Sequence, residues 1–269
     1  MKGLIKKCFG DPLNGYFLLF SMVLLLSSNG IENAHGMDDE NELGKKVYET
    51  RCLLCHGING DGKGMVGTIR RAEKNGRVIE TYPRDLTLGV FMFRTTPTGC
   101  LPIDDDLLMT IKNGVKRSFM PSHEELPKEE REAVKEYIKI FSERWEEEDL
   151  CEEHITVKRP EWVGTLSSVE KGKEQYDLMK CWECHGYDGK GHGPSSDTLK
   201  DDAGNKSWPF DFTTGELKRG STPENIYLTF TTGLDGTPMP SYGDTLGEED
   251  RWHLVSFTVQ LMESGDHAK

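Results

Sequence analysis

Cys52-Leu53-Leu54-Cys55-His56-Gly57 recurs further along the chain as Cys181-Trp182-Glu183-Cys184-His185-Gly186, and this matching pair decides the fold. A segment with a glycine and a tyrosine at the same spacing precedes each copy, Gly44 to Tyr48 in the first and Gly172 to Tyr176 in the second. Three further matches follow in the same order: Asp61-Gly62-Lys63-Gly64 with Asp188-Gly189-Lys190-Gly191, Pro83-Arg84-Asp85-Leu86-Thr87 with Pro209-Phe210-Asp211-Phe212-Thr213, and Met120-Pro121-Ser122 with Met239-Pro240-Ser241. Because the order is preserved throughout, the sequence indicates an internal duplication.

Each copy is predicted to form three helices joined by long, glycine-containing loops. Leu43, Val47 and Leu54 recur with helical spacing just before and within the first cysteine motif. The predicted helices are Glu42–Leu54, Asp104–Asn113 and Lys128–Ser142 in the first copy and, in the second, Val169–Lys180, a helix with Thr222 as N-cap, Pro223 at its first position and Gly233 after its end, and Glu248–Met262. No run of alternating residues bounded by turns argues for a sheet, so the predicted fold class is all-α.

The composition excludes one large class of partner. The chain has 269 residues, with 33 Lys and Arg against 46 Asp and Glu, which gives a formal net charge of −13. A nucleic-acid-binding protein needs basic side chains to replace the counterions of the phosphates. We therefore expect no nucleic acid partner. Hydrophobic residues at 35% and charged residues at 29% are typical of a soluble globular protein.

Residues 1–30 are predicted to be a signal peptide. Lys2, Lys6 and Lys7 precede the apolar run Tyr16–Leu26, which is shorter than the roughly 20 residues that a membrane-spanning helix needs. Cleavage after Gly30 or after Ala34 fits equally, and an uncleaved N-terminal anchor is the alternative. We expect export to the periplasm or an equivalent compartment, with no membrane span after signal removal.

Between the two copies lies a segment rich in acidic residues. We place a first domain at residues 37–142, an acidic linker at 143–166 and a second domain at 167–265. Each domain contains few aliphatic residues for its length, and domains of this size are marginally stable on burial alone. The sequence therefore predicts that a large apolar group occupies each core.

The spacing Cys-x-x-Cys-His is typical of covalent haem c attachment. The two thiols reach the two vinyl carbons of one porphyrin, and the adjacent imidazole becomes an iron ligand. Two covalent haem c groups are predicted, attached at Cys52, Cys55, His56, Cys181, Cys184 and His185. The alternatives are disulfides or zinc sites, but zinc prefers Cys₄ or Cys₂His₂ sets, and a cysteine pair with an adjacent histidine is cramped for that geometry.

Met120 and Met239 are the predicted second axial ligands of the two irons. Each follows a glycine-terminated helix, and each precedes a proline that restricts its loop. Histidine and methionine together fill both axial positions, raise the potential and suit electron transfer. His123 and His192 are the rival ligands.

With these motifs in place, residues 42 to 262 resemble class I cytochromes c, and the chain resembles a dihaem member with two such domains in tandem. The resemblance implies that the first and last helices of each domain cross and that the haem edge is exposed. It implies that Cys52, Cys55, His56 and Met120 hold the first haem, with Cys181, Cys184, His185 and Met239 on the second. The stretch Phe91–Gly99 is loosely similar to dihaem cytochromes that accompany respiratory molybdenum oxidoreductases, including nitrite oxidoreductases, and this implies such a partner.

The sequence thus predicts an electron-transfer protein with no catalytic residues, acting as a shuttle or as the cytochrome subunit of an oxidoreductase complex. Its acidic surface favours redox partners with a basic docking face. The alternative is a dihaem peroxidase-like enzyme with one haem open to substrate.

Two features have no counterpart in the other copy. The first is a basic insert, Arg70–Arg77, which is interpreted as a solvated loop, with partner docking or pairing to a haem propionate as alternatives. The second is the pair Cys100 and Cys151, which could form a disulfide, remain free thiols or bridge to a partner.

Overall fold

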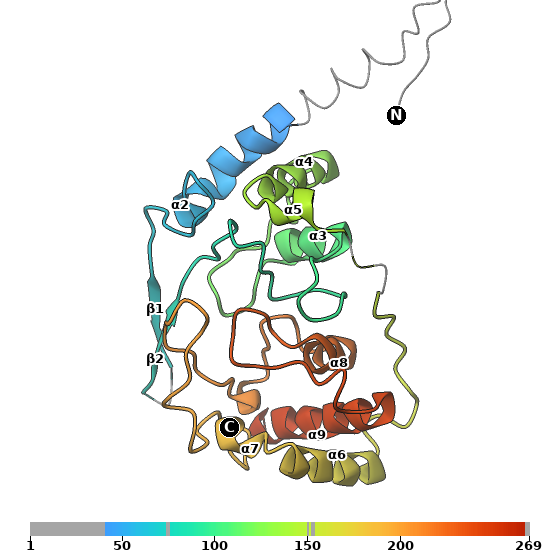
Figure 1. The fold of residues 1–269 in the computed structure, drawn as a ribbon. Helices are drawn as coiled ribbons and strands as arrows, with labels where there is room; N and C mark the ends of the chain where they lie inside the picture. The colour runs from blue at the N-terminus through green and yellow to red at the C-terminus, as the bar shows by residue number, and fades with distance from the viewer. Residues whose placement is uncertain (1–40, 74–75, 150, 152–153, 267–269) are drawn as a thin grey trace, which may run out of the picture. The chain divides into compact units, whose positions relative to one another are not determined.

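The computed structural model describes residues 41–73, 76–149, 151 and 154–266, which belong to one compact unit, Asp38–Lys269 (Figure 1). The predicted signal peptide, residues 1–30, lies outside the described residues. No helix in the described ranges is long and apolar enough to cross a membrane. We call residues 41–142 the first repeat and residues 166–266 the second repeat.

Both repeats contain the three predicted helices. The first repeat has a helix over residues 41–51, then α2 (Leu53–His56), β1 (Ile69–Ala72), β2 (Val78–Thr81), α3 (Asp104–Asn113) and α4 (Lys128–Lys139). A short helix α5 (Arg144–Glu147) follows, and the second repeat has α6 (Leu166–Leu178), α7 (Trp182–His185), the 3₁₀ helix η1 (Phe212–Thr214), α8 (Pro223–Thr232) and α9 (Glu248–Asp266).

In each repeat the first helix crosses the last at a glycine. A methyl group on Gly44 would lie 2.2 Å from the carbonyl oxygen of Ala133 in α4, and one on Gly172 would lie 2.0 Å from that of His253 in α9. Figure 1 shows α6 lying along α9. Because any side chain would push the two backbones apart, the glycines at the start of each repeat allow the crossing that the resemblance implies.

Two separate apolar cores lie beside these crossings. In the first repeat, Tyr48 packs on Tyr137 and Phe141, with ring centroids 5.4 and 5.0 Å apart. The second core is larger and is built around the buried Trp252 and Tyr176. Two cores that share no residue are consistent with a duplicated unit.

The middle helices α3 and α8 have the predicted bounds. Thr222 caps α8 by accepting a hydrogen bond from the Asn225 N–H, as expected for a threonine before a helix. Gly114 and Gly233 end the two helices with φ of 65° and 67°, a region in which glycine is favoured. Their ψ values of −172° and −167° differ from the left-handed helical cap that the sequence predicts for Gly114.

The basic insert is not the solvated loop predicted from the sequence. Its first residues, Arg70–Ala72, lie on β1, which pairs antiparallel with β2 just beyond the insert, and Arg70 Nε lies 2.7 Å from Glu80 Oε1. Arg77 reaches the second repeat, where it donates a 2.7 Å hydrogen bond to the Gly191 carbonyl. Exposure alternates along β1, but its sequence, Ile-Arg-Arg-Ala, does not alternate apolar with polar residues, so the usual signal of a strand is missing. The described fold is therefore helical apart from this hairpin.

Of the alternatives left open for Cys100 and Cys151, the structure has the disulfide: the two are bonded, with their Cα atoms 6.1 Å apart. It ties the first repeat to the linker, 51 residues further along the chain. Beyond it, the Ile155 N–H donates to the Thr95 carbonyl, and Ile155 packs against the second core. The linker is thus fastened to both repeats.

Candidate functional site

The two Cys-x-x-Cys-His segments have the same local geometry. Each forms a single turn of helix, α2 or α7, that ends at a glycine with positive φ. The buried hydroxyl of Tyr48 donates a 2.7 Å hydrogen bond to the Gly57 carbonyl, and Tyr176 donates a 2.6 Å bond to that of Gly186. Each tyrosine therefore fixes the end of the turn that carries the histidine.

Both histidine rings are oriented through one nitrogen. His56 Nδ1 lies 3.1 Å from the Arg84 carbonyl oxygen, and His185 Nδ1 lies 3.2 Å from that of Phe210. A carbonyl only accepts, so each Nδ1 carries the proton and each Nε2 has its lone pair available, as a metal-ligating imidazole requires.

The electrostatics of both rings favour the neutral form. Burial lowers the pKa of His185 to about 4, and burial together with the charges of Arg84 and His123 lowers the pKa of His56. A neutral imidazole is the form that binds iron.

The motif cysteines are free thiols and are not paired with one another. Burial raises the pKa of Cys52 to about 11 and that of Cys181 to about 12, so both are protonated at neutral pH. In the ranges described, no three His, Cys, Asp or Glu side chains converge on a metal-sized site. The geometry favours attachment through the thiols over the zinc and disulfide alternatives.

The two predicted methionine ligands lie on loops closed by the same backbone hydrogen bond. The Val115 N–H donates to the Met120 carbonyl, and the Leu234 N–H donates to the Met239 carbonyl, each at 3.1 Å. The loops fold back tightly on the glycines that end α3 and α8. A methyl group on Gly114 would lie 2.5 Å from the Pro121 carbonyl carbon, so a side chain there would displace the methionine loop.

The rival histidines occupy different places. His123 is buried beside the end of α3, where its backbone N–H donates to the carbonyls of Ile111 and Lys112. Its repeat counterpart, Tyr242, packs in the second core and perturbs the pKa of Cys181. His192 projects toward solvent with 56% of its side chain exposed, 3.6 Å from Asp188. His123 thus lies three residues beyond Met120 on the loop between α3 and α4, whereas His192 lies in the second repeat between α7 and η1.

A group of basic side chains between the repeats provides a test of whether haem fits. Burial lowers the pKa of Lys218, and repulsion from the charges of Arg84, Arg71 and Arg117 lowers it further. Attraction to Asp201 opposes this lowering. Next to Lys218, Arg219 Nη1 is buried without a hydrogen-bond partner among the described residues.

Unpaired buried cations are costly and call for a neutralising anion. A haem brings two propionate carboxylates, so the residues present fit this group.

Sequence reasoning missed the residues that join the repeats. Arg94 is wholly buried, although arginine is rarely buried without a partner. Its partner is Asp235, which lies in the second repeat in the loop before Met239. The two residues are too far apart in sequence for a local pattern to indicate the pair. The hydrogen bonds of Tyr48 and Tyr176 to the motif glycines could have been inferred, because a tyrosine occurs at the same position in both copies of the repeat.

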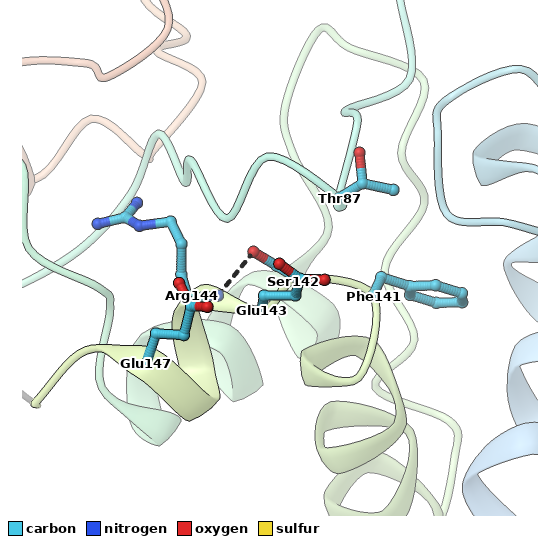
Figure 2. Close-up of a pocket in the computed structure, with 6 residues that line it drawn as sticks. All are labelled: Thr87, Phe141, Ser142, Glu143, Arg144 and Glu147. Atoms are coloured by element: carbon cyan, nitrogen blue, oxygen red, sulfur yellow. Dashed lines mark hydrogen bonds between the residues drawn. The ribbon is translucent and has the colours of Figure 1, made fainter.

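A shallow pocket lies away from these residues. Figure 2 shows it between Thr87 and the turn that joins α4 to α5, with the Arg144 N–H donating to Ser142 Oγ at 3.4 Å. Its lining is Thr87, Phe141, Ser142, Glu143, Arg144 and Glu147. It contains none of the predicted haem residues, and we assign it no function.

Comparison with known proteins gives matches over both repeats. Residues 39–138 match the family of cytochrome c oxidase, cbb3-type, subunit III, and residues 169–261 match the cytochrome c family. No curated protein sequence matches the chain.

A solved structure also matches. A chain of the reducing HAO-like protein complex of Kuenenia stuttgartiensis is 41% identical, with a TM-score of 0.74. The match covers 82% of the present chain and 96% of that chain.

Proposed function

The chain belongs to the dihaem c-type cytochromes, and from this premise we propose that it carries single electrons between redox proteins through two haem c groups, one in each repeat. The observation that supports this most directly is the repeated pairing of a cysteine motif with a histidine whose Nδ1 is bonded to a backbone carbonyl. The bound haem would supply the chemistry, a reversible change of one electron at iron.

The protein's own residues would bind and orient this group. Cys52, Cys55, Cys181 and Cys184 would hold it covalently, while Arg84 and Phe210 keep the two imidazoles in one tautomer and one orientation. Met120 and Met239 would each supply a second protein ligand to one iron. With the same residues holding each iron in either oxidation state, little rearrangement would accompany electron transfer.

We further propose that the redox partner is an HAO-like protein. The similar chain from Kuenenia stuttgartiensis is part of a complex of HAO-like proteins, and the present chain spans nearly all of it. This favours the role of a bound electron-transfer subunit over that of a free shuttle. A molybdenum oxidoreductase, suggested by the stretch Phe91–Gly99, has no such support. A basic docking face on the partner would match the net charge of −13.

The domain limits and the location complete the proposal. We place the domains at residues 37–142 and 167–265, joined by the linker 143–166, and we infer export by the signal peptide at residues 1–30. The disulfide between Cys100 and Cys151 supports export, since such bonds persist mainly outside the cytoplasm.

The alternative, a dihaem peroxidase-like enzyme, needs one iron without a methionine ligand. The loops that carry Met120 and Met239 share the same backbone hydrogen bond, so neither repeat is distinguished as the open one. No observation favours the enzyme.

The test is expression in a host that attaches haem c, followed by mass spectrometry and a redox titration of the purified protein. Two covalent haems per chain, low-spin in both oxidation states, are expected. Reduction of the purified protein by a co-expressed HAO-like protein that binds it would support the proposed partner. A chain without covalent haem would contradict the whole proposal, whereas failure of the partner to bind would contradict only the partner.

A further inference from the structure

Arg94 of the first repeat is hydrogen-bonded to the loop that carries Met239 in the second repeat. Arg94 is wholly buried, and its guanidinium lies 2.6 Å from one carboxylate oxygen of Asp235 and 2.8 Å from the other. It also donates a 2.7 Å hydrogen bond to the Thr232 carbonyl at the end of α8. Thr98 Oγ and the Gly99 N–H donate to the same carboxylate. The start of the Met239 loop is therefore bonded to the first repeat.

The Met120 loop, in the first repeat, is held by residues of the second repeat. Arg117 belongs to this loop, and its guanidinium donates a 2.6 Å hydrogen bond to Thr214 Oγ in the second repeat. It also lies over the ring of Phe210, 4.9 Å from the centroid. Arg117 has a φ of 59°, which is unfavourable for a residue with a side chain. Its guanidinium also pairs with Glu73 of the first repeat, so contacts on both sides of the junction hold Arg117 in that conformation.

Each methionine loop also contacts the residue that orients the opposite histidine. Arg117 covers Phe210, whose carbonyl orients His185. In the other direction, Arg84 orients His56 through its carbonyl, and its Nη1 would lie 2.5 Å from a methyl group on Gly236 in the Met239 loop. Gly236 occupies the same loop position as Arg117. The relationship is thus reciprocal between the repeats.

We propose that each repeat positions the methionine loop of the other, with Arg94 holding Met239 against its iron and Arg117 holding Met120. Both arginines are positioning residues, since they act through the loops and not on the haem. The inference rests on the proposed function, because it takes the two methionines as ligands. It follows that neither iron keeps its methionine firmly unless the two repeats are joined.

The experiment measures how fast imidazole displaces methionine in the oxidised, haem-loaded full chain, since displacement requires the loop to open. Met120→Ala and Met239→Ala assign the two kinetic phases to the two haems. We expect Arg94→Gln to accelerate displacement about tenfold at the second haem and to leave the first unchanged, the factor expected for loss of a charged hydrogen bond. Arg117→Gln should accelerate displacement at the first haem and leave the second unchanged. Thr214→Val should do the same, because it removes the acceptor in the second repeat and keeps the pair of Arg117 with Glu73.

A second variant, Asp235→Asn, separates loss of the ion pair from misfolding caused by removal of Arg94. It removes the charge of the partner but keeps Arg94 and its hydrogen bonds to backbone carbonyls. It should act in the same direction as Arg94→Gln. Two controls remove a positive charge from another side chain. Lys116 is an exposed residue of the Met120 loop, at the position that Asp235 has in the Met239 loop, and Lys116→Gln removes its charge while keeping Arg117. Arg159→Gln changes a half-exposed arginine paired with Glu224. Both controls should leave both rates unchanged.

Equal acceleration at both haems by Arg94→Gln, or no acceleration by either arginine variant, would overturn the inference while leaving the proposed function intact. If neither methionine variant alters imidazole binding, the methionines are not ligands, and both the inference and that part of the proposed function are wrong.

Discussion

The hydroxyl of Tyr176 donates a 2.6 Å hydrogen bond to the carbonyl of Gly186, the residue directly after His185. Both groups are buried, and burial raises the pKa of Tyr176 well above its usual value, so the phenol stays protonated and donates. The bond holds the end of the turn on which His185 lies.

Tyr176→Phe should therefore destabilise the haem-loaded protein by about 1–2 kcal/mol, because the Gly186 carbonyl loses its buried partner. Denaturant unfolding monitored by haem absorbance measures this. Tyr187→Phe is the matched control, since Tyr187 is 67% exposed and should change stability by less than about 0.5 kcal/mol. Equal effects of the two variants would show that the hydroxyl of Tyr176 contributes nothing specific.

Removal of either predicted methionine ligand should open one iron. In Met120→Ala or Met239→Ala, one haem of the reduced protein should bind carbon monoxide, and its midpoint potential should fall, because methionine ligation raises it. Met65→Ala is the control, as this side chain is 91% exposed. Carbon monoxide titration of the unaltered protein should show no binding, and binding there would favour the peroxidase-like alternative.

The sequence predicted the repeated parts of this protein well and the parts between the repeats poorly. The bounds of α3 and the cap of α8 at Thr222 follow from local signals, a run of aspartates in one case and a Thr-Pro start in the other. The hairpin pairs residues that are close along the chain, Ile69–Ala72 with Val78–Thr81, but neither strand alternates apolar with polar residues in its sequence. The pair of Arg94 with Asp235 joins residues 141 positions apart. No local pattern specifies which distant surface an arginine will meet, so contacts between repeats could not be predicted.

Loss of the disulfide should destabilise the protein without preventing haem attachment. The bond between Cys100 and Cys151 closes a loop of about fifty residues, for which we expect a stabilisation of about 2–4 kcal/mol. Denaturant unfolding of a Cys100→Ser and Cys151→Ser double variant measures this. Reductant should lower the stability of the unaltered protein toward that of the variant, and it should leave the variant unchanged. If reductant destabilises both equally, the effect does not arise from this bond.

Asp104 makes a contribution to stability that depends on pH. Its carboxylate lies 2.7 Å from Lys135 Nζ and 2.6 Å from Lys139 Nζ. Partial burial of Asp104 opposes ionisation, but the hydrogen bonds from both lysines outweigh it and lower the pKa of Asp104 below its usual 3.8. The charged form is thus favoured in the folded state.

A carboxyl with a lowered pKa stabilises the fold above its unfolded pKa and loses this contribution as the pH falls through its folded pKa. Asp104→Asn should cost about 1 kcal/mol at pH 7, discounted for an exposed fraction near half, and the cost should shrink below about pH 4. Denaturant unfolding at several pH values measures it. Asp105→Asn removes the same charge from the same helical turn at an exposed position, and should cost less at every pH. A cost for Asp104→Asn that does not change with pH would contradict the assignment to this ionised cluster, because a neutral hydrogen bond would persist in acid.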